Sequence, residues 1–140
     1  MTVIFIGQKD APKKIQRRIR RVIVELIKNH EARKFYVGSN EGFDAMVVNE
    51  LRKLKYLLPF IEYHVVPAFL PSDGYTSDHP IEFPYGIKKL PKRYAVKIRN
   101  KWMLDNADVV VTYITHGWSG AAKFVQLAER KKKTVINLYQ

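Results

Sequence analysis

The chain has 140 residues, of which 46% are hydrophobic, and its formal net charge is +12. This length suits one domain with a buried core, and the hydrophobic content excludes an intrinsically disordered protein. Cysteine is absent, which excludes disulfides and thiolate metal sites. No apolar run reaches the roughly eighteen residues of a membrane-spanning helix, and the N-terminus lacks the features of a signal peptide. We therefore expect a single cytoplasmic domain over residues 1–140 that does not associate with membranes.

The strongly basic charge predicts attraction to polyanions, although a charged and merely solvated helix face explains it equally well. Six basic residues cluster in one short segment and indicate nucleic acid as a partner: Lys13, Lys14, Arg17, Arg18, Arg20 and Arg21. No aromatic residue interleaves with them for base stacking. Nucleic acid is therefore the secondary prediction.

Short β-branched runs alternate with helical patterns, as in parallel βαβ units. In chain order, the pattern predicts a strand over 2–6, a helix that opens at 11 and has an apolar stripe from Ile15 to Ile27, a strand over 34–37, a helix over 41–56 and a strand over 61–66. Residues 71–93, rich in proline and glycine, predict an irregular insertion. A helix over 94–106, a strand over 108–114, a helix from 117 to about 132 and a strand over 134–138 complete the chain.

Five strands joined by helical crossovers predict an α/β, Rossmann-like, doubly wound sheet with helices on both faces. The expected strand order is 3-2-1-4-5, with the first and fourth strands adjacent where the winding reverses. Ligands of such sheets bind beyond the carboxyl ends of the strands at this switch point. The insertion follows the third strand, so it is a candidate lid or dimer contact. Its adjacent Asp78 and His79 are too weak a signal to predict a metal site.

Both loops at the switch point carry residues suited to a ligand. Gly7 and Gln8 follow the first strand, and His116, Gly117, Ser119 and Gly120 follow the fourth. Glycines let the backbone approach a phosphate closely, and the N-terminus of a helix favours its negative charge. A tight turn without any ligand explains the same glycines.

Two further segments point to the same crevice. After the second strand come Gly38, Asn40, Gly42 and Asp44, where Asp44 is a candidate for holding a ribose hydroxyl or simply favours the helix dipole. Before the fourth strand, Arg99 and Asn100 lie on the preceding helix, and an arginine there is suited to a phosphate.

These segments, Gly38 to Asp44, Arg99 to Met103 and His116 to Ala122, together resemble the SLOG superfamily, and in particular a small, largely uncharacterised bacterial branch of it. The resemblance covers essentially the whole chain. It implies a Rossmann-like fold that binds nucleotides or their derivatives. The superfamily includes the lonely-guy phosphoribohydrolases and a DNA-processing protein that loads single-stranded DNA, and oligomers are common among relatives, so a homodimer is expected.

The match to the lonely-guy enzymes is partial. Arg99, Met103, Gly117 and Gly120 fit their motifs, but Phe124 occupies the position of their catalytic glutamate. A phenyl ring can neither accept a proton nor stabilise an oxocarbenium ion. The resemblance therefore argues against the same N-glycosidic mechanism, unless Asp44, Glu41 or His116 supplies the acid or base.

The sequence thus predicts a sensor or effector that binds a nucleotide-derived ligand, with no certain cofactor and no metal. Its expected contacts are Gly7, Gln8, Gly38, Asn40, Gly42, Asp44, Arg99, Asn100, His116, Gly117, Ser119 and Gly120. An N-glycosidic or phosphoribosyl hydrolase and a basic nucleic-acid-binding protein are the alternatives.

Overall fold

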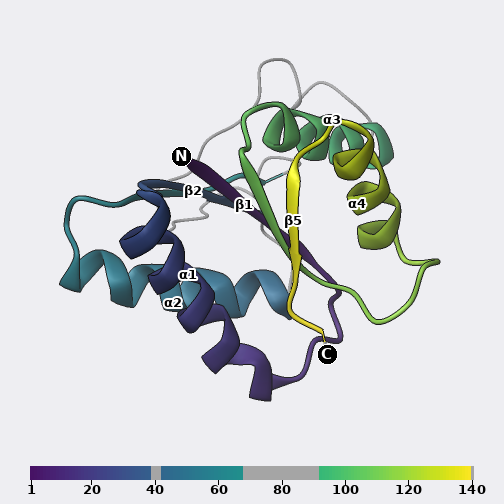
Figure 1. Cartoon of the computed structure of the whole chain (residues 1–140). Coiled ribbons are helices and arrows are strands. Elements are labelled where there is room, and N and C mark those ends of the chain that lie inside the picture. The colour runs from purple at the N-terminus through teal and green to yellow at the C-terminus, as the bar shows by residue number, and fades with distance from the viewer. Residues whose placement is uncertain (39–41, 68–91, 140) are drawn as a thin grey trace, which may run out of the picture.

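Five parallel strands form one sheet in the computed structural model, which describes residues 1–38, 42–67 and 92–139. The strands are β1 (Thr2–Gly7), β2 (Lys34–Val37), β3 (Glu62–Val65), β4 (Val109–Tyr113) and β5 (Thr134–Asn137). Their order is β3-β2-β1-β4-β5, so the predicted topology is confirmed (Figure 1). At the centre of the sheet, Val3 of β1 pairs with Phe35 on one side and with Val109 on the other.

Helices cover both faces of the sheet, as predicted. A short 3-10 turn, η1 (Lys13–Ile15), leads into α1 (Gln16–His30), which packs beside α2 (Phe43–Leu57) on one face. On the other face lie α3 (Lys92–Asp105) and α4 (Gly120–Arg130) (Figure 1). Among the described residues, none of these helices has the length and apolarity needed to cross a membrane.

The structure corrects several predicted boundaries. The first helix was expected from residue 11, but Lys13–Ile15 form a 3-10 turn and α1 begins at Gln16. α4 begins at Gly120 rather than at residue 117, because Ser119 has an extended backbone and caps the helix. α3 begins at Lys92, so the end of the segment 71–93 is helical and not irregular. The rest of that segment, with the predicted lid and its Asp78 and His79, lies outside the described residues.

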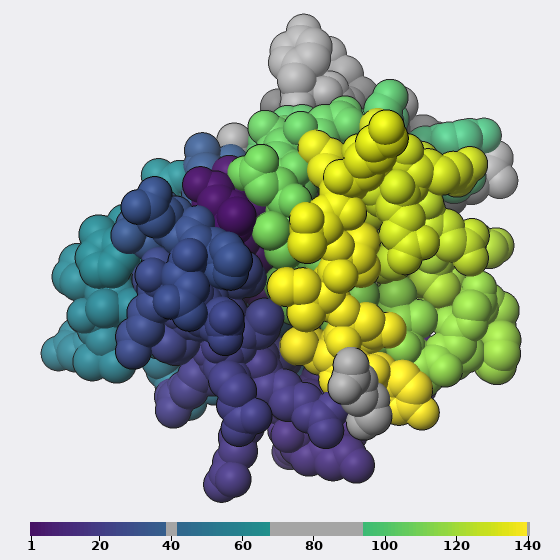
Figure 2. Space-filling view, viewed as in Figure 1, coloured from purple at the N-terminus to yellow at the C-terminus, as the bar shows by residue number. Residues whose placement is uncertain are grey.

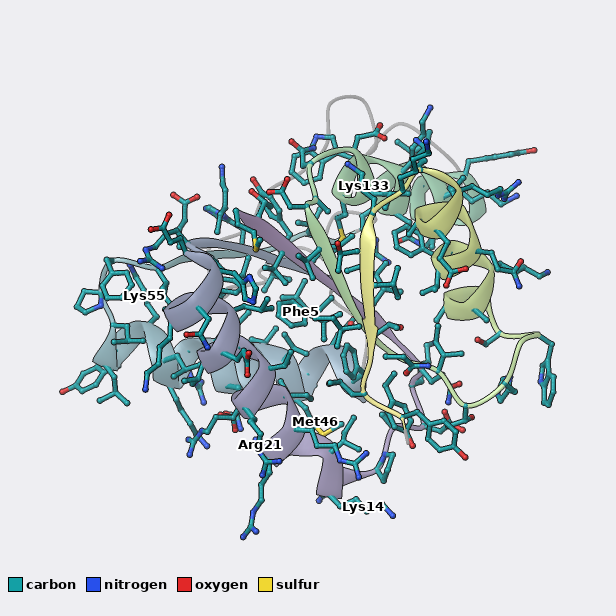
Figure 3. All side chains as sticks on the ribbon, in the orientation of Figure 1. Phe5, Lys14, Arg21, Met46, Lys55 and Lys133 are labelled. Carbon is teal, nitrogen blue, oxygen red and sulfur yellow. The ribbon has the colours of Figure 1, made fainter. Side chains whose placement is uncertain are left out.

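Alternate side chains of the strands enter two separate cores. Val3 and Phe5 pack under α1 and α2, where the ring of Phe5 lies between the sheet and the helices (Figure 3). Ile4 points the other way and packs against Met103 and Phe124 of α3 and α4. Burial on both faces explains why β1 is apolar throughout instead of alternating with polar residues. In Figure 2 the yellow C-terminal segment lies at the surface between the two helical layers.

Candidate functional site

A cavity of about 940 Å³ lies beyond the carboxyl ends of β1 and β4, on the side of the sheet covered by α3 and α4. Its volume falls within the range of about 300–1,000 Å³ typical of small-molecule sites. In Figure 1 both strands end toward the lower right, where loops lead into η1 and α4. The apolar part of its wall includes Ile6, Val96, Phe124 and Leu127.

Nine of the twelve contacts expected from the sequence line this one cavity. They are Gly7, Gln8, Gly38, Asp44, Arg99, Asn100, His116, Ser119 and Gly120. Gly42 and Gly117 are not part of its wall, and Asn40, like Glu41, lies outside the described residues. Segments distant in the sequence therefore converge as the switch-point rule predicts.

Gln8 joins the two loops of the switch point. Its side chain is buried, and its Oε1 accepts hydrogen bonds from Thr115 N at 2.7 Å and Thr115 Oγ1 at 3.2 Å. Its Nε2 donates to Asp10 Oδ1 at 3.0 Å. Both ends of the amide are thus engaged within the protein. Gln8 holds the β1 and β4 loops together at the edge of the cavity.

The loop after β1 also packs tightly on the start of α2. A Cβ at Gly7 would lie 2.5 Å from the Phe43 ring, and a Cβ at Gly42 would collide with the carbonyl oxygen of Lys9. Gly42 has φ of +70°, a conformation that other residues rarely adopt. Gly42 therefore serves loop packing, although it was predicted as a ligand contact.

Asp44 and Arg99 meet beside Gly38 at the end of β2. A Cβ at Gly38 would lie 2.7 Å from Asp44 Oδ2 and 2.8 Å from Arg99 Nη1. Both charged side chains are only 3% exposed. Glycine at this position leaves the room in which α2 and α3 bring opposite charges to the same point of the cavity wall.

Arg99 is also anchored by hydrogen bonds. Its Nη1 donates to the carbonyl oxygen of Val66 at 3.0 Å, and its Nε donates to Asn100 Oδ1 at 2.7 Å. Burial lowers the pKa of Arg99, and the nearby Asp44 carboxylate partly opposes this. The cavity thus has a fixed and desolvated cation in its wall.

The N-terminus of α4 forms the opposite side of the cavity. Ser119 Oγ accepts a hydrogen bond from Ala122 N at 3.0 Å and so caps the helix. The N–H groups of Gly120 and Ala121 belong to the first turn, where no acceptor exists within the helix, and both residues line the cavity. A Cβ at Gly117 or Gly120 would meet no atom within 4 Å. Packing within the described residues therefore does not require either glycine.

An aromatic pair stands next to this helix terminus. The rings of His116 and Trp118 stack with centroids 4.0 Å apart and planes 14° from parallel. His116 lines the cavity, whereas Trp118 is 77% exposed. The ring stack was not predicted, because nothing in the sequence pattern around His116 and Trp118 indicates it.

Four exposed lysines of the cavity wall were missed by the sequence analysis: Lys9, Lys97, Lys101 and Lys123. Lys97 and Lys101 are four residues apart on α3, a spacing that places two side chains on the same face of a helix. That spacing was the available signal. The acidic residues of the wall are Asp10 and Asp44, so within the described chain the cations prevail. Among the same residues, no group of three or more His, Asp or Glu is placed to hold a metal ion.

Comparison with solved structures finds the same fold in DNA processing protein A (DprA) from Streptococcus pneumoniae, with a TM-score of 0.68 and 15% sequence identity. The alignment covers 97% of this chain and 49% of that protein, so the chain spans about half the length of its structural relative. No family model matches the sequence, and no curated protein matches it. The likeness establishes a Rossmann-like fold of the DprA type.

Proposed function

We propose that this protein binds a nucleotide or nucleotide-derived ligand in the cavity at the carboxyl ends of its strands, as a sensor or effector. The observation that carries the proposal is one large cavity with an apolar wall, a buried Asp44–Arg99 pair and the N-terminus of α4. Base and ribose favour apolar and hydrogen-bonding surfaces, and a phosphate favours free N–H groups and cations.

The phosphate is assigned to the α4 side of the cavity. The N–H groups of Gly120 and Ala121 favour a negatively charged group of the ligand, and so do the side chains of Lys101 and Lys123. Arg99 is assigned to orienting the ligand from the opposite wall. Its bonds to Val66 and Asn100 already engage part of the guanidinium, so removing it would also disturb the fold.

The test therefore uses exposed lysines instead of Arg99. Thermal shifts of the protein are measured with nucleoside monophosphates, ADP-ribose, nicotinamide dinucleotides and cyclic nucleotides. A ligand at about one hundred times its Kd should add about 2.7 kcal/mol to the stability, a shift of several degrees. The variant Lys101→Gln/Lys123→Gln should lose most of that shift.

The control variant Lys28→Gln/Arg130→Gln removes the same charge from the C-terminal turns of α1 and α4, away from the cavity. It should keep the shift of the native protein. Equal losses in both variants would mean that net charge, and not the cavity, attracts the ligand. No shift with any member of the panel would refute the proposal.

Hydrolysis of the ligand is the alternative function, and incubation with a nucleotide that the protein binds tests it. Phe124 lines the cavity, and the resemblance to the lonely-guy enzymes places it where they carry a glutamate; Asp44 is buried beside Arg99. We therefore expect no free base to be released when the protein is incubated with a nucleoside monophosphate that it binds. Release of the base at a rate that depends on Asp44 or His116 would mean that the protein is a hydrolase and not a sensor.

A further inference from the structure

A second cationic surface lies on the opposite face of the sheet, in a hollow of about 560 Å³ between α1 and α2. Five cations line this α1–α2 groove: Lys13, Lys14, Arg17, Arg20 and Lys53. Among the described residues, its wall and that of the cavity at the strand ends have none in common. The two surfaces can therefore be tested separately.

A buried carboxylate organises the floor of the groove. Glu50 is 3% exposed, and its oxygens accept hydrogen bonds from Gln16 Nε2 and Arg20 Nε, each at 2.9 Å. Lys53 Nζ lies 4.0 Å from Glu50 Oε1. Glu50 thus fixes the position of Arg20 and ties α1 to α2.

The other three cations have no anionic partner in the described part of the chain. Lys13 and Lys14 lie in η1 and Arg17 in the first turn of α1, a region without any acidic residue. Cations at the N-terminus of a helix oppose its dipole, so their arrangement costs stability and strengthens the positive potential of the groove. Lys14 points away from the sheet at this end of α1 (Figure 3).

The shape and chemistry of the groove indicate which polyanion fits. Lys13, Arg17 and Arg20 follow one side of the helix over roughly 10 Å, a length of axis along which one strand of a duplex carries about three phosphates. The described wall contains no aromatic or apolar side chain, so it offers no aromatic ring on which an unpaired base can stack. A surface of this kind contacts phosphates and does not read sequence.

We propose that the α1–α2 groove binds the phosphate backbone of duplex nucleic acid without sequence preference. The structure also refines the basic cluster defined from the sequence. Arg18 donates instead to the carbonyl oxygen of Leu138 at 2.8 Å, and Arg21 does not line the groove and points into solvent (Figure 3). Lys53 of α2 joins the surface in their place.

The test is fluorescence anisotropy with a labelled DNA duplex of about 20 base pairs at NaCl concentrations of about 50 to 200 mM. The plot of log K against log salt should be linear for the native protein. Each phosphate contact contributes about 0.9 to its slope, so Lys14→Gln/Arg17→Gln should reduce the magnitude of the slope by about 1.8 and weaken binding. The same variant should unfold at a higher temperature than the native protein, because it removes cations from the start of a helix.

Two matched variants define the outcome. Lys28→Gln/Arg130→Gln and the cavity variant Lys101→Gln/Lys123→Gln should each keep the native slope. An equal drop in these controls would overturn the proposal in favour of a general charge effect. So would tighter binding of the single strand than of its duplex, tighter binding to phosphatidylserine vesicles, or full competition by inorganic tripolyphosphate at similar concentration.

Discussion

At the scale of single residues, glycines that look alike in the sequence differ in what they do. Gly42 and Gly117 were both predicted to contact the ligand. Gly42 instead has φ of +70° and leaves no room for a Cβ beside Lys9, whereas a Cβ at Gly117 would enter open space. The sequence could not separate them, because the need for glycine at 42 arises from a loop more than thirty positions away.

This difference predicts opposite effects of alanine at the two positions. Gly42→Ala should destabilise the protein by about 1–3 kcal/mol or more, since it adds a steric clash to an unfavourable backbone conformation. Gly117→Ala should be neutral or stabilise it by about 0.4–1 kcal/mol through the lower entropy of the unfolded chain. Urea unfolding of both variants measures this, and equal losses would show that the loop adapts around Gly42.

Tyr63 gives a prediction for alkaline pH. Its ring is buried in β3, and burial raises its pKa above 10.0, partly opposed by the positive charge of Arg52. The unfolded chain ionises this tyrosine first. The stability that the neutral phenol contributes is therefore complete below about pH 10 and is lost as the pH rises through the raised folded-state value. The urea midpoint of Tyr63→Phe should consequently fall less between about pH 9 and pH 11 than that of the native protein; parallel curves would contradict the shift.

Whether a site residue could be predicted from the sequence depends on what positions it in the fold. Gly38, Asp44 and Arg99 were foreseen because they end or adjoin elements at the switch point, and the topology alone brings them together. Lys97 and Lys123 were not foreseen, because the sequence does not show what an exposed lysine on a helix faces until the helix is placed; the spacing of Lys97 and Lys101 shows only that these two share one face of the helix. Gln8 was predicted to contact a ligand, but its hydrogen bonds to Thr115 became visible only when β1 and β4 were paired.

At the scale of secondary-structure elements, the strands were easier to predict than the ends of the helices. The bounds of β2 match the prediction, because its apolar residues are followed at once by Gly38. The helix starts were less accurate. Pro12 precedes a 3-10 turn before α1, and α2 starts at Phe43 without a side-chain cap. Local signals fix these starts only when a capping side chain is present, as Ser119 is for α4.

The cap of α4 allows stability and ligand binding to be separated. Ser119→Ala should destabilise the protein by about 1 kcal/mol through loss of the bond to Ala122 N. Ser119→Asp should keep the cap and the stability, but its negative charge at the cavity wall should weaken a phosphate-bearing ligand. Urea unfolding and the ligand-induced thermal shift, measured on both variants, test this. Undiminished binding by Ser119→Asp would place the phosphate elsewhere.

At the scale of the whole molecule, the fold was the most predictable feature. The order of the strands follows from the alternation of elements and from the handedness of crossovers, neither of which depends on an individual contact. The sheet then separates two cationic surfaces, with the cavity at the strand ends on the α3–α4 side and the α1–α2 groove on the other. The net charge of +12 could not show that division, because it sums over both faces.

The central position of β1 has a consequence for synthesis of the chain. One of its edges pairs with β2, which follows soon in the sequence, but the other pairs with β4, at a separation of 106 residues between Val3 and Val109. A ribosome adding roughly 5–20 residues per second produces β4 about 5–20 s after β1. Throughout that interval the nascent chain exposes an apolar strand edge of the kind that pairs with other chains. Folding during translation therefore depends on whatever shields that edge until β4 arrives.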